Sequence, residues 1–300
     1  MKNLFISFFA SCALGVSALM MSTALHTPLA FSQSAEEFGV VINLSGKQRM
    51  LTQKMSKEVM LIALDENKSE NLKNLKATAA LFDKTLTGLR AGDSDLKLPA
   101  TESERILRQL GRVDKLWAEF YPVVQSITGK GSVDDAEVST IAAKNLPLLK
   151  QMNKAVGAYE REATKGGMKA DPGLATTLNL SGKQRMLTQK MSKEFFLVAT
   201  NHEVADNRLN LLETFTLFER TLTGLKVGDD TLGLPPTEDT SILDQLDKVI
   251  ALWTEAKPTF VSASQGSDIS GADVQKIAKL NLPLLKEMNK AVGMYEALAK

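Results

Sequence analysis

One block of sixteen residues, 43–58, carries the side chains best suited to binding a small anion. If the block is helical, Arg49 lies on a face of small or hydrogen-bonding residues, namely Ser45, Gly46, Thr52, Gln53 and Ser56. Small residues let another helix approach closely, and a guanidinium group offers a planar fork of donors that fits a planar oxyanion. Lys47, Lys54 and Lys57 make the block locally basic. The pattern therefore predicts an anion site at a helix–helix contact.

Two interpretations without a ligand compete with the anion site. An arginine among serines and lysines is also typical of a solvated helix face, or of an ion pair with a carboxylate across a helical bundle. A tightly packed helix contact would likewise keep such a block unchanged. The residues of the block alone leave these alternatives open.

The same block occurs a second time in the chain. Residues 179–194 repeat residues 43–58 letter for letter at an offset of 136, which supplies Ser181, Gly182, Arg185, Thr188 and Gln189. The offset also aligns shorter identical stretches, at 85–89, 145–150 and 152–157 in the first copy. Solenoid units span about 20–50 residues, so this repeat is a duplicated domain. Because the flanks have diverged and the block has not, we expect it to do more than space helices.

Composition argues against several other classes of function. The 36 basic and 35 acidic residues give no overall field that would favour nucleic acid or a membrane surface. The single cysteine, Cys12, lies in the leader described below, so the mature chain has no thiolate for catalysis or metal binding. His202 aligns with Glu66 of the first copy, which makes it a poor catalytic candidate. We therefore expect no enzyme, no metal and no cofactor.

Residues 1–32 resemble a secretory signal. Lys2 precedes an apolar run over residues 4–25, and Ala30 and Ser32 are the small residues of a cleavage site. The prediction is a periplasmic protein that is not inserted in a membrane after cleavage. An uncleaved anchor is the alternative; lipidation of Cys12 is disfavoured because Cys12 lies inside the apolar run.

The remainder of each copy reads as four helices. Apolar residues recur at helical spacing in the first of them, from Val41 through Leu51 to Ile62. The expected helices are 36–64, 69–90, 101–127 and 134–165, then 172–200, 205–226, 237–263 and 271–299, with a capping box at 101–104 and a linker at 166–173. The predicted fold is all-α: two tandem four-helix up-down bundles, over residues 33–168 and 169–300.

Three further residue types receive a structural interpretation. Pro147 and Pro283 fall inside the fourth helices, where a bend is favoured over a late helix start. Trp117 and Trp253 are expected to plug the two bundles. The methionines of the blocks lie at five-residue spacing around the helix, so they are expected to fill the core rather than bind copper.

The block resembles the signature of PilJ-type sensor domains, the extracytoplasmic N-terminal region of type IV pili methyl-accepting chemotaxis transducers. It is also similar to the P-box of nitrate/nitrite sensor kinases. The resemblance implies a four-helix bundle and, in members that bind nitrate, a site where the first helices of two subunits meet and each contributes an arginine. By motif, Arg49 and Arg185 would be the clamp, while Gly46, Gly182, Ser45 and Ser181 allow close approach.

The sequence departs from that family in having two copies and no recognisable second span or signalling region. We therefore expect the dimer to be made within one chain, with one anion between Arg49 and Arg185. If the copies face outward instead, the chain would form a homodimer with two sites. The expected function is nitrate-like anion sensing, coupled to a membrane receptor or transporter. The alternative is a helical adaptor for a receptor or for the pilus or chemotaxis apparatus that binds no small ligand.

Overall fold

The computed structural model describes residues 34–169 and 171–299, so the expected signal and its cleavage site lie outside the described residues. Ser32–Lys300 is one compact unit. Its described residues form helices without any β-strand, apart from two isolated bridges, which confirms the all-α fold. Within these residues no helix has the length and apolar character needed to cross a membrane.

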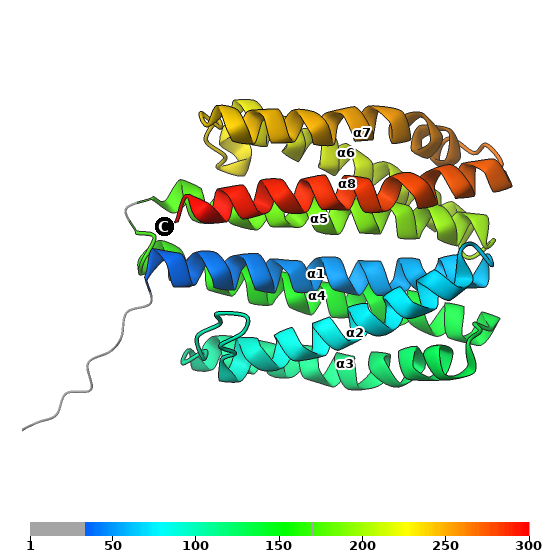
Figure 1. Cartoon of the computed structure of the whole chain (residues 1–300), viewed down its shortest axis with the longest axis horizontal. Helices are drawn as coiled ribbons and strands as arrows, with labels where there is room; N and C mark the ends of the chain where they lie inside the picture. Colours follow the sequence, from blue (N-terminus) through cyan, green and yellow to red (C-terminus); the bar gives the residue numbers. More distant parts are fainter. Residues whose placement is uncertain (1–33, 170, 300) are drawn as a thin grey trace, which may run out of the picture. The chain divides into compact units, whose positions relative to one another are not determined.

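Each copy contributes four long helices (Figure 1). Those of the first copy are α1 (Ala35–Ala63), α2 (Lys68–Ala91), α3 (Glu104–Lys130) and α4 (Asp135–Lys165). Those of the second are α5 (Pro172–Ala199), α6 (Val204–Val227), α7 (Thr240–Ser264) and α8 (Gly271–Ala297), with a short 3₁₀ turn, η1 (Asp230–Leu232). These bounds match the predicted helices closely, except at both ends of α3 and at the start of α7, each of which differs by three residues.

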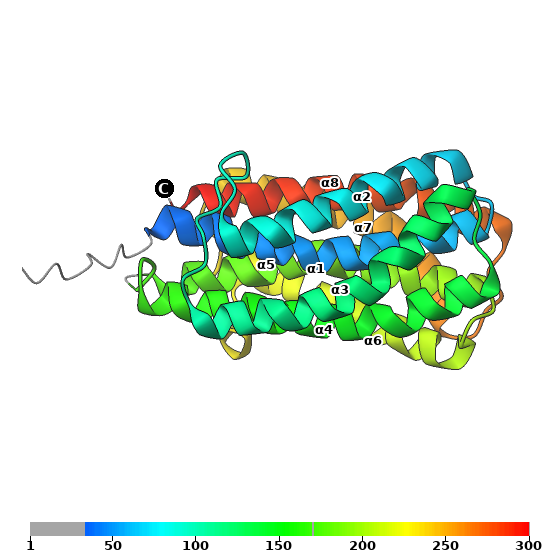
Figure 2. The ribbon, with the colours of Figure 1, turned by 90° about the horizontal axis from the view of Figure 1, so that it is seen from below.

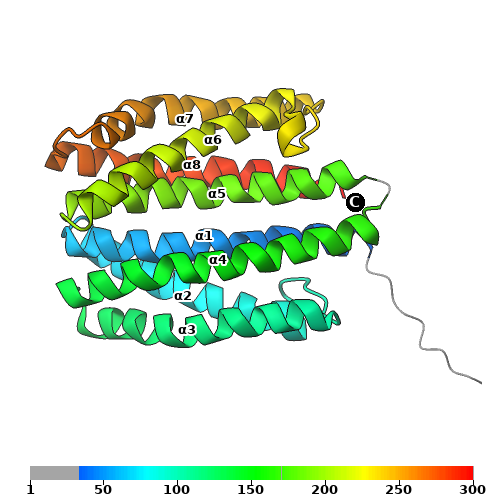
Figure 3. The same cartoon turned by 180° about the vertical axis from the view of Figure 1, so that it is seen from behind.

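The two first helices, α1 and α5, lie side by side in the middle of the unit and run in the same direction (Figures 1 and 3). Their contact is the most extensive one between any two elements. α4 and α8 also touch both of them, whereas α2 and α3 lie on the side away from the second copy (Figure 2). The two copies of the block therefore face one another within a single chain.

The apolar side chains fill the bundles as expected. The methionines of the two blocks and the paired tryptophans are all buried, namely Met50, Met55, Met186, Met191, Trp117 and Trp253. Each tryptophan also donates its indole N–H to an acidic residue of the preceding helix, Asp83 or Glu219. These contacts confirm the core role of both residue types.

The predicted capping box at 101–104 is wrong. α3 begins at Glu104, and its N-cap residue, Ser103, makes no capping hydrogen bond. Thr101 instead donates its hydroxyl to the Leu89 carbonyl at 2.6 Å, which ties the connection to the end of α2. Thr237 makes the same contact with Leu225 in the second copy, so α7 also starts three residues later than predicted.

The late-start alternative for the proline-containing helices is also wrong. α4 is already helical from Asp135, and α8 from Gly271, well before Pro147 and Pro283. Two further prolines, Pro122 and Pro258, lie inside α3 and α7.

Candidate functional site

Arg49 and Arg185 meet at the contact between α1 and α5. Their exposed fractions are 3% and 1%. A Cβ atom on Gly46 would lie 3.3 Å from Arg49 Nη2 and 3.6 Å from Arg185 Nη2. One on Gly182 would lie 3.4 Å from Arg185 Nη2 and 3.6 Å from Arg49 Nη2. Both guanidinium groups therefore end beside both glycines, where a Cβ atom would be in close contact with them.

Each guanidinium group is held by its own copy and by the opposite one. Arg49 donates to Asn153 Oδ1 on α4 at 3.3 Å and to the Asn179 carbonyl on α5 at 2.9 Å. Arg185 donates to Asn289 Oδ1 on α8 and to the Asn43 carbonyl on α1, both at 2.9 Å. The Nε–H of each arginine is buried and has no hydrogen-bond partner in the described residues. Both groups are thus fixed in direction, while the Nε–H of each stays unused.

The charges of the two arginines are not neutralised by a direct ion pair. Among residues 34–169 and 171–299, no carboxylate lies within ion-pair distance of either guanidinium group. Burial lowers the pKa of Arg49 to about 10. Burial and the charge of Arg49 lower the pKa of Arg185 to about 9, although the more distant Glu296 opposes this shift. At neutral pH the contact therefore encloses two like charges.

The remaining charged groups nearby fall into two sets. Burial lowers the pKa of Lys47 and Lys183, and the arginine of the opposite copy lowers each further. Glu160 accepts a hydrogen bond from Asn179 Nδ2 at 2.6 Å, and Glu296 accepts one from Asn43 Nδ2. Burial raises the pKa of Glu160, while its hydrogen bond from Asn179 and the charge of Arg49 oppose the shift.

Comparison with known proteins places this sequence in a family. The family described as "PilJ: Type IV pili methyl-accepting chemotaxis transducer N-term" matches residues 30–140 and 170–277, which is more than half of the chain. The chain belongs to the PilJ family. Each match covers the block of one copy and ends near the start of that copy's fourth helix, so Asn153 and Asn289 lie outside the matched segments.

One relative is a methyl-accepting chemotaxis protein, McpN, from Pseudomonas aeruginosa strain PAO1. It is 26% identical over 165 residues, which cover 54% of this chain and 29% of McpN. The chain thus spans less than a third of the length of this relative. No solved structure matches the chain.

The small polar residues of the PilJ blocks are buried against their own helices. Ser45 and Ser181 donate to the carbonyls of Ile42 and Leu178. Thr52 and Thr188 donate to the carbonyls of Arg49 and Arg185, both at 2.8 Å, and accept from Gln53 and Gln189. The Oε1 atoms of both glutamines are buried without a partner in the described region.

The alternative of a solvated face for the PilJ block is wrong, because these side chains and both arginines are buried. The residues of the predicted site do share one helix face. The arginines and glycines form its centre, and the serine and threonine hydroxyls are already used within their own copy.

Lysines form a second polar layer that the sequence reasoning missed. Lys57 donates to Asn281 Oδ1 on α8 at 2.9 Å, and Lys193 donates to Asn145 Oδ1 on α4 at 3.4 Å. Both lysines are buried, and burial lowers the pKa of each to about 8. Asn145 in turn donates to the Thr52 carbonyl and to Ser56 Oγ.

The sequence contained a signal for the asparagines that bond to these arginines and lysines. Asn145 and Asn281 begin the repeated stretch at 145–150, and Asn153 and Asn289 lie in the stretch at 152–157. Every anchoring asparagine is therefore identical between the copies. What the sequence did not indicate is that the lysine contacts cross from one copy to the other.

Proposed function

We propose that this chain is a periplasmic sensory module that captures one small planar oxyanion, such as nitrate, between Arg49 and Arg185. It passes its state to a membrane receptor or transporter and carries out no catalysis. The family membership and the chemotaxis relative support the sensory role. The resemblance to nitrate/nitrite sensor P-boxes suggests which planar anions to try first.

The observation that carries this proposal is the buried pair of like charges. Taking a cation out of water costs several kcal/mol unless an opposite charge accompanies it. An anion between Arg49 and Arg185 would supply that charge, and their free Nε–H groups offer donors for its oxygens. Gly46 and Gly182 leave room for both guanidinium groups at this point.

The size of the ligand limits the expected affinity. A four-atom anion at the ceiling of about −1.5 kcal/mol per heavy atom gains about −6 kcal/mol, which corresponds to a dissociation constant of tens of micromolar. Because the site contains one arginine from each copy, we expect one anion per chain.

The test is isothermal titration of the chain from residue 33 onward with nitrate in chloride-free buffer. We expect one site per chain in the wild type and no measurable heat after Arg49→Met plus Arg185→Met. Methionine keeps an unbranched side chain but removes the charge, so the double variant should remain helical and melt at a higher temperature. A matched control, Arg112→Met plus Arg220→Met, removes one exposed arginine from each copy and should leave binding unchanged.

Three outcomes would contradict the proposal. Retained nitrate affinity in the double methionine variant would show that the arginines are not the clamp. A wild-type chain that gives no heat with nitrate, nitrite or other planar oxyanions would favour the adaptor alternative. Two sites per chain would move binding away from the contact between α1 and α5.

A further inference from the structure

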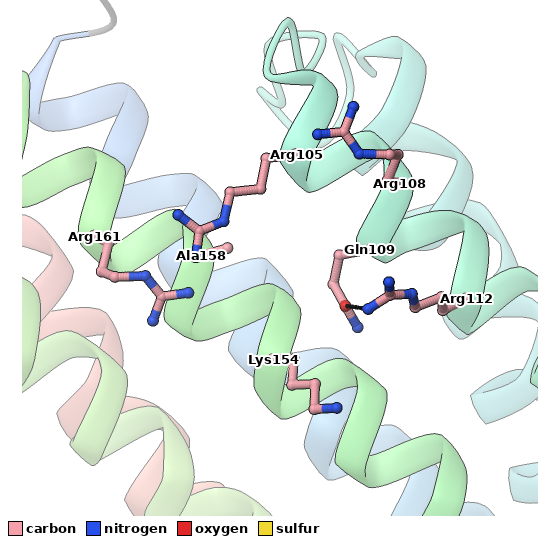
Figure 4. A pocket seen from close by; sticks show the side chains of 7 residues that line it. All are labelled: Arg105, Arg108, Gln109, Arg112, Lys154, Ala158 and Arg161. Carbon is pink, nitrogen blue, oxygen red and sulfur yellow. Dashed lines mark hydrogen bonds between the residues drawn. The ribbon is translucent and has the colours of Figure 1, made fainter.

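A second cationic feature lies on the outer side of the first copy, away from the contact between the copies. It is a cleft of about 360 Å³ between α3 and α4, lined by Arg105, Arg108, Gln109, Arg112, Lys154, Ala158 and Arg161. Figure 4 shows Arg105 and Arg161 extending toward each other from the two helices, close to Ala158. The five cations are exposed, whereas Gln109 and Ala158 are buried in the floor.

The spacing of the cations directs them into the same cleft. Arg105, Arg108 and Arg112 follow one face of α3 at intervals of three and four residues. Lys154 and Arg161 are seven residues apart on α4, which is two helical turns or about 10.5 Å. The cleft is therefore a short cationic trough rather than a single charged point.

Little in the surroundings balances these charges. Arg108 pairs with Glu104 at 3.0 Å, an exposed contact within one helix, and in the described part of the chain it alone of the five has a carboxylate at ion-pair distance. Gln109 Oε1 accepts a hydrogen bond from Arg112 at 3.3 Å, and Gln109 Nε2 donates to Gln151. The polar floor thus adds no negative charge.

The second copy provides a comparison within the same chain. At the offset of 136, Ser241, Asp244 and Ala297 replace the three arginines Arg105, Arg108 and Arg161. Lys248 and Lys290 keep their charges, but Glu287 takes the place of Gln151 and accepts a hydrogen bond from Gln245. The equivalent surface of the second copy is therefore balanced, with two cations and two carboxylates. Because that copy forms the same helices, the fold does not require the cations.

We propose that this cleft binds a compact polyanion, a small molecule that carries several phosphate or carboxylate groups. Four of the five cations are arginines, whose planar forks suit such oxygens. The cavity has the volume of a small-molecule site and too little apolar lining to hold a hydrophobic group. A singly charged anion would neutralise only one of the five charges. Gathering like charges on a surface costs stability through self-repulsion, and a polyanion offsets that cost.

The experiment is a titration of the chain from residue 33 onward with inorganic tripolyphosphate, and with citrate as the carboxylate counterpart. The cleft variant Arg105→Ser, Arg108→Asp and Arg161→Ala gives the first copy the residues of the second. We expect one site per chain in the wild type, and affinity for tripolyphosphate or citrate that is weaker by at least about tenfold in the variant. The helical circular dichroism signal of the cleft variant should match that of the wild type, which shows that the variant is folded.

The control variant Lys248→Gln plus Lys290→Gln removes both cations from the equivalent surface of the second copy. It should keep the polyanion affinity within about twofold. The inference is overturned if neither polyanion binds, if the cleft variant binds as well as the wild type, or if the control variant loses as much affinity. If the chain binds an acidic peptide or an anionic vesicle but neither tripolyphosphate nor citrate, the partner is a macromolecule, and the inference is also overturned.

Discussion

Gly46 and Gly182 lie beside the two guanidinium groups at the contact between α1 and α5. In a helix, glycine is ordinarily a cost of about 1 kcal/mol relative to alanine. Here the missing Cβ leaves the space beside Arg49 Nη2 and Arg185 Nη2. Replacing either glycine by alanine would therefore favour the helix, but the added methyl group would press against the guanidinium groups.

Gly46→Ala should weaken nitrate binding by about tenfold without lowering stability. The new methyl group would stand 3.3 Å from Arg49 Nη2 and displace it by a few tenths of an ångström, and sites lose function at displacements of about 0.5 Å. Titration measures the affinity and chemical denaturation the stability. Gly111→Ala on α3 is the control, because its Cβ meets nothing within 4 Å. It should stabilise the chain and leave binding intact; equal affinity in both variants would contradict the role of Gly46.

At this scale the sequence predicted the central residues but not their bonding. Helical spacing placed Arg49 on a face of small residues, and the duplication indicated Arg185 as its counterpart. It could not distinguish Lys57 from Lys47 and Lys54, because residue type and spacing do not reveal which face a second copy covers. The basic cleft could have been found by aligning Arg105 and Arg108 with Ser241 and Asp244.

α1 and α5 differ from ordinary amphipathic helices because they are covered on nearly every side. α1 touches α2, α4, α5 and α8, and most of its residues are buried, including Gln48, Thr52 and Lys57. Its polar face therefore does not meet water but the equivalent face of α5. Buried polar groups of this kind need partners, and the asparagines of α4 and α8 supply them. Asn145 and Asn281 each donate to a backbone carbonyl of their own copy and accept a hydrogen bond from a lysine of the opposite copy.

The lysine layer makes stability depend on pH. The pKa of Lys57 and Lys193 falls from 10.5 to about 8 in the folded chain, so above pH 8 the unfolded state binds more protons. The free energy of unfolding should then rise with pH, by up to about 1.4 kcal/mol per pH unit for each lysine. Urea unfolding at about pH 7.5 and about pH 9.5 measures this slope.

Lys57→Met plus Lys193→Met is the comparison for that slope. Arg49 and Arg185 have lowered pKa values in both proteins, so the difference between wild type and variant isolates the lysines. The urea concentration at the unfolding midpoint should rise less with pH in the variant than in the wild type. If the free energy of unfolding changes with pH equally in both proteins, the pKa values of the two lysines are not lowered by folding.

Helix boundaries followed from periodicity and punctuation, and thirteen of the sixteen ends of the eight α-helices shifted by two residues or fewer. The exception is instructive because Thr101 matched a capping pattern but bonds to the end of α2. A side chain that can cap its own helix can also bond to another element, and only the packed structure decides between them. The same competition explains the start of α7 through Thr237.

Across the whole molecule, the contact that would otherwise need two chains is made inside one. α1 and α5 pack in parallel, and each arginine bonds to a carbonyl of the opposite copy. The duplication predicted this pairing as one of two possibilities. Periodicity alone could not exclude copies that face outward, because both arrangements use the same apolar stripes.

An internal site should not respond to dilution. At a fixed nitrate concentration, the rise in melting temperature should be the same at protein concentrations about a hundredfold apart. The buried Trp117 and Trp253 allow the transition to be followed by fluorescence at both concentrations. A smaller rise in the dilute sample would show that the site forms between chains.

Joining the two halves by a peptide linker also removes the symmetry that identical subunits impose. In a pair of identical chains every substitution occurs twice, so the two arginines of the proposed site could only be changed together. Here Arg49 and Arg185 belong to separate stretches of one gene product, and either can change while the other stays. In the proposed anion site, the two arginine positions can therefore diverge during evolution, one toward affinity and the other toward selectivity.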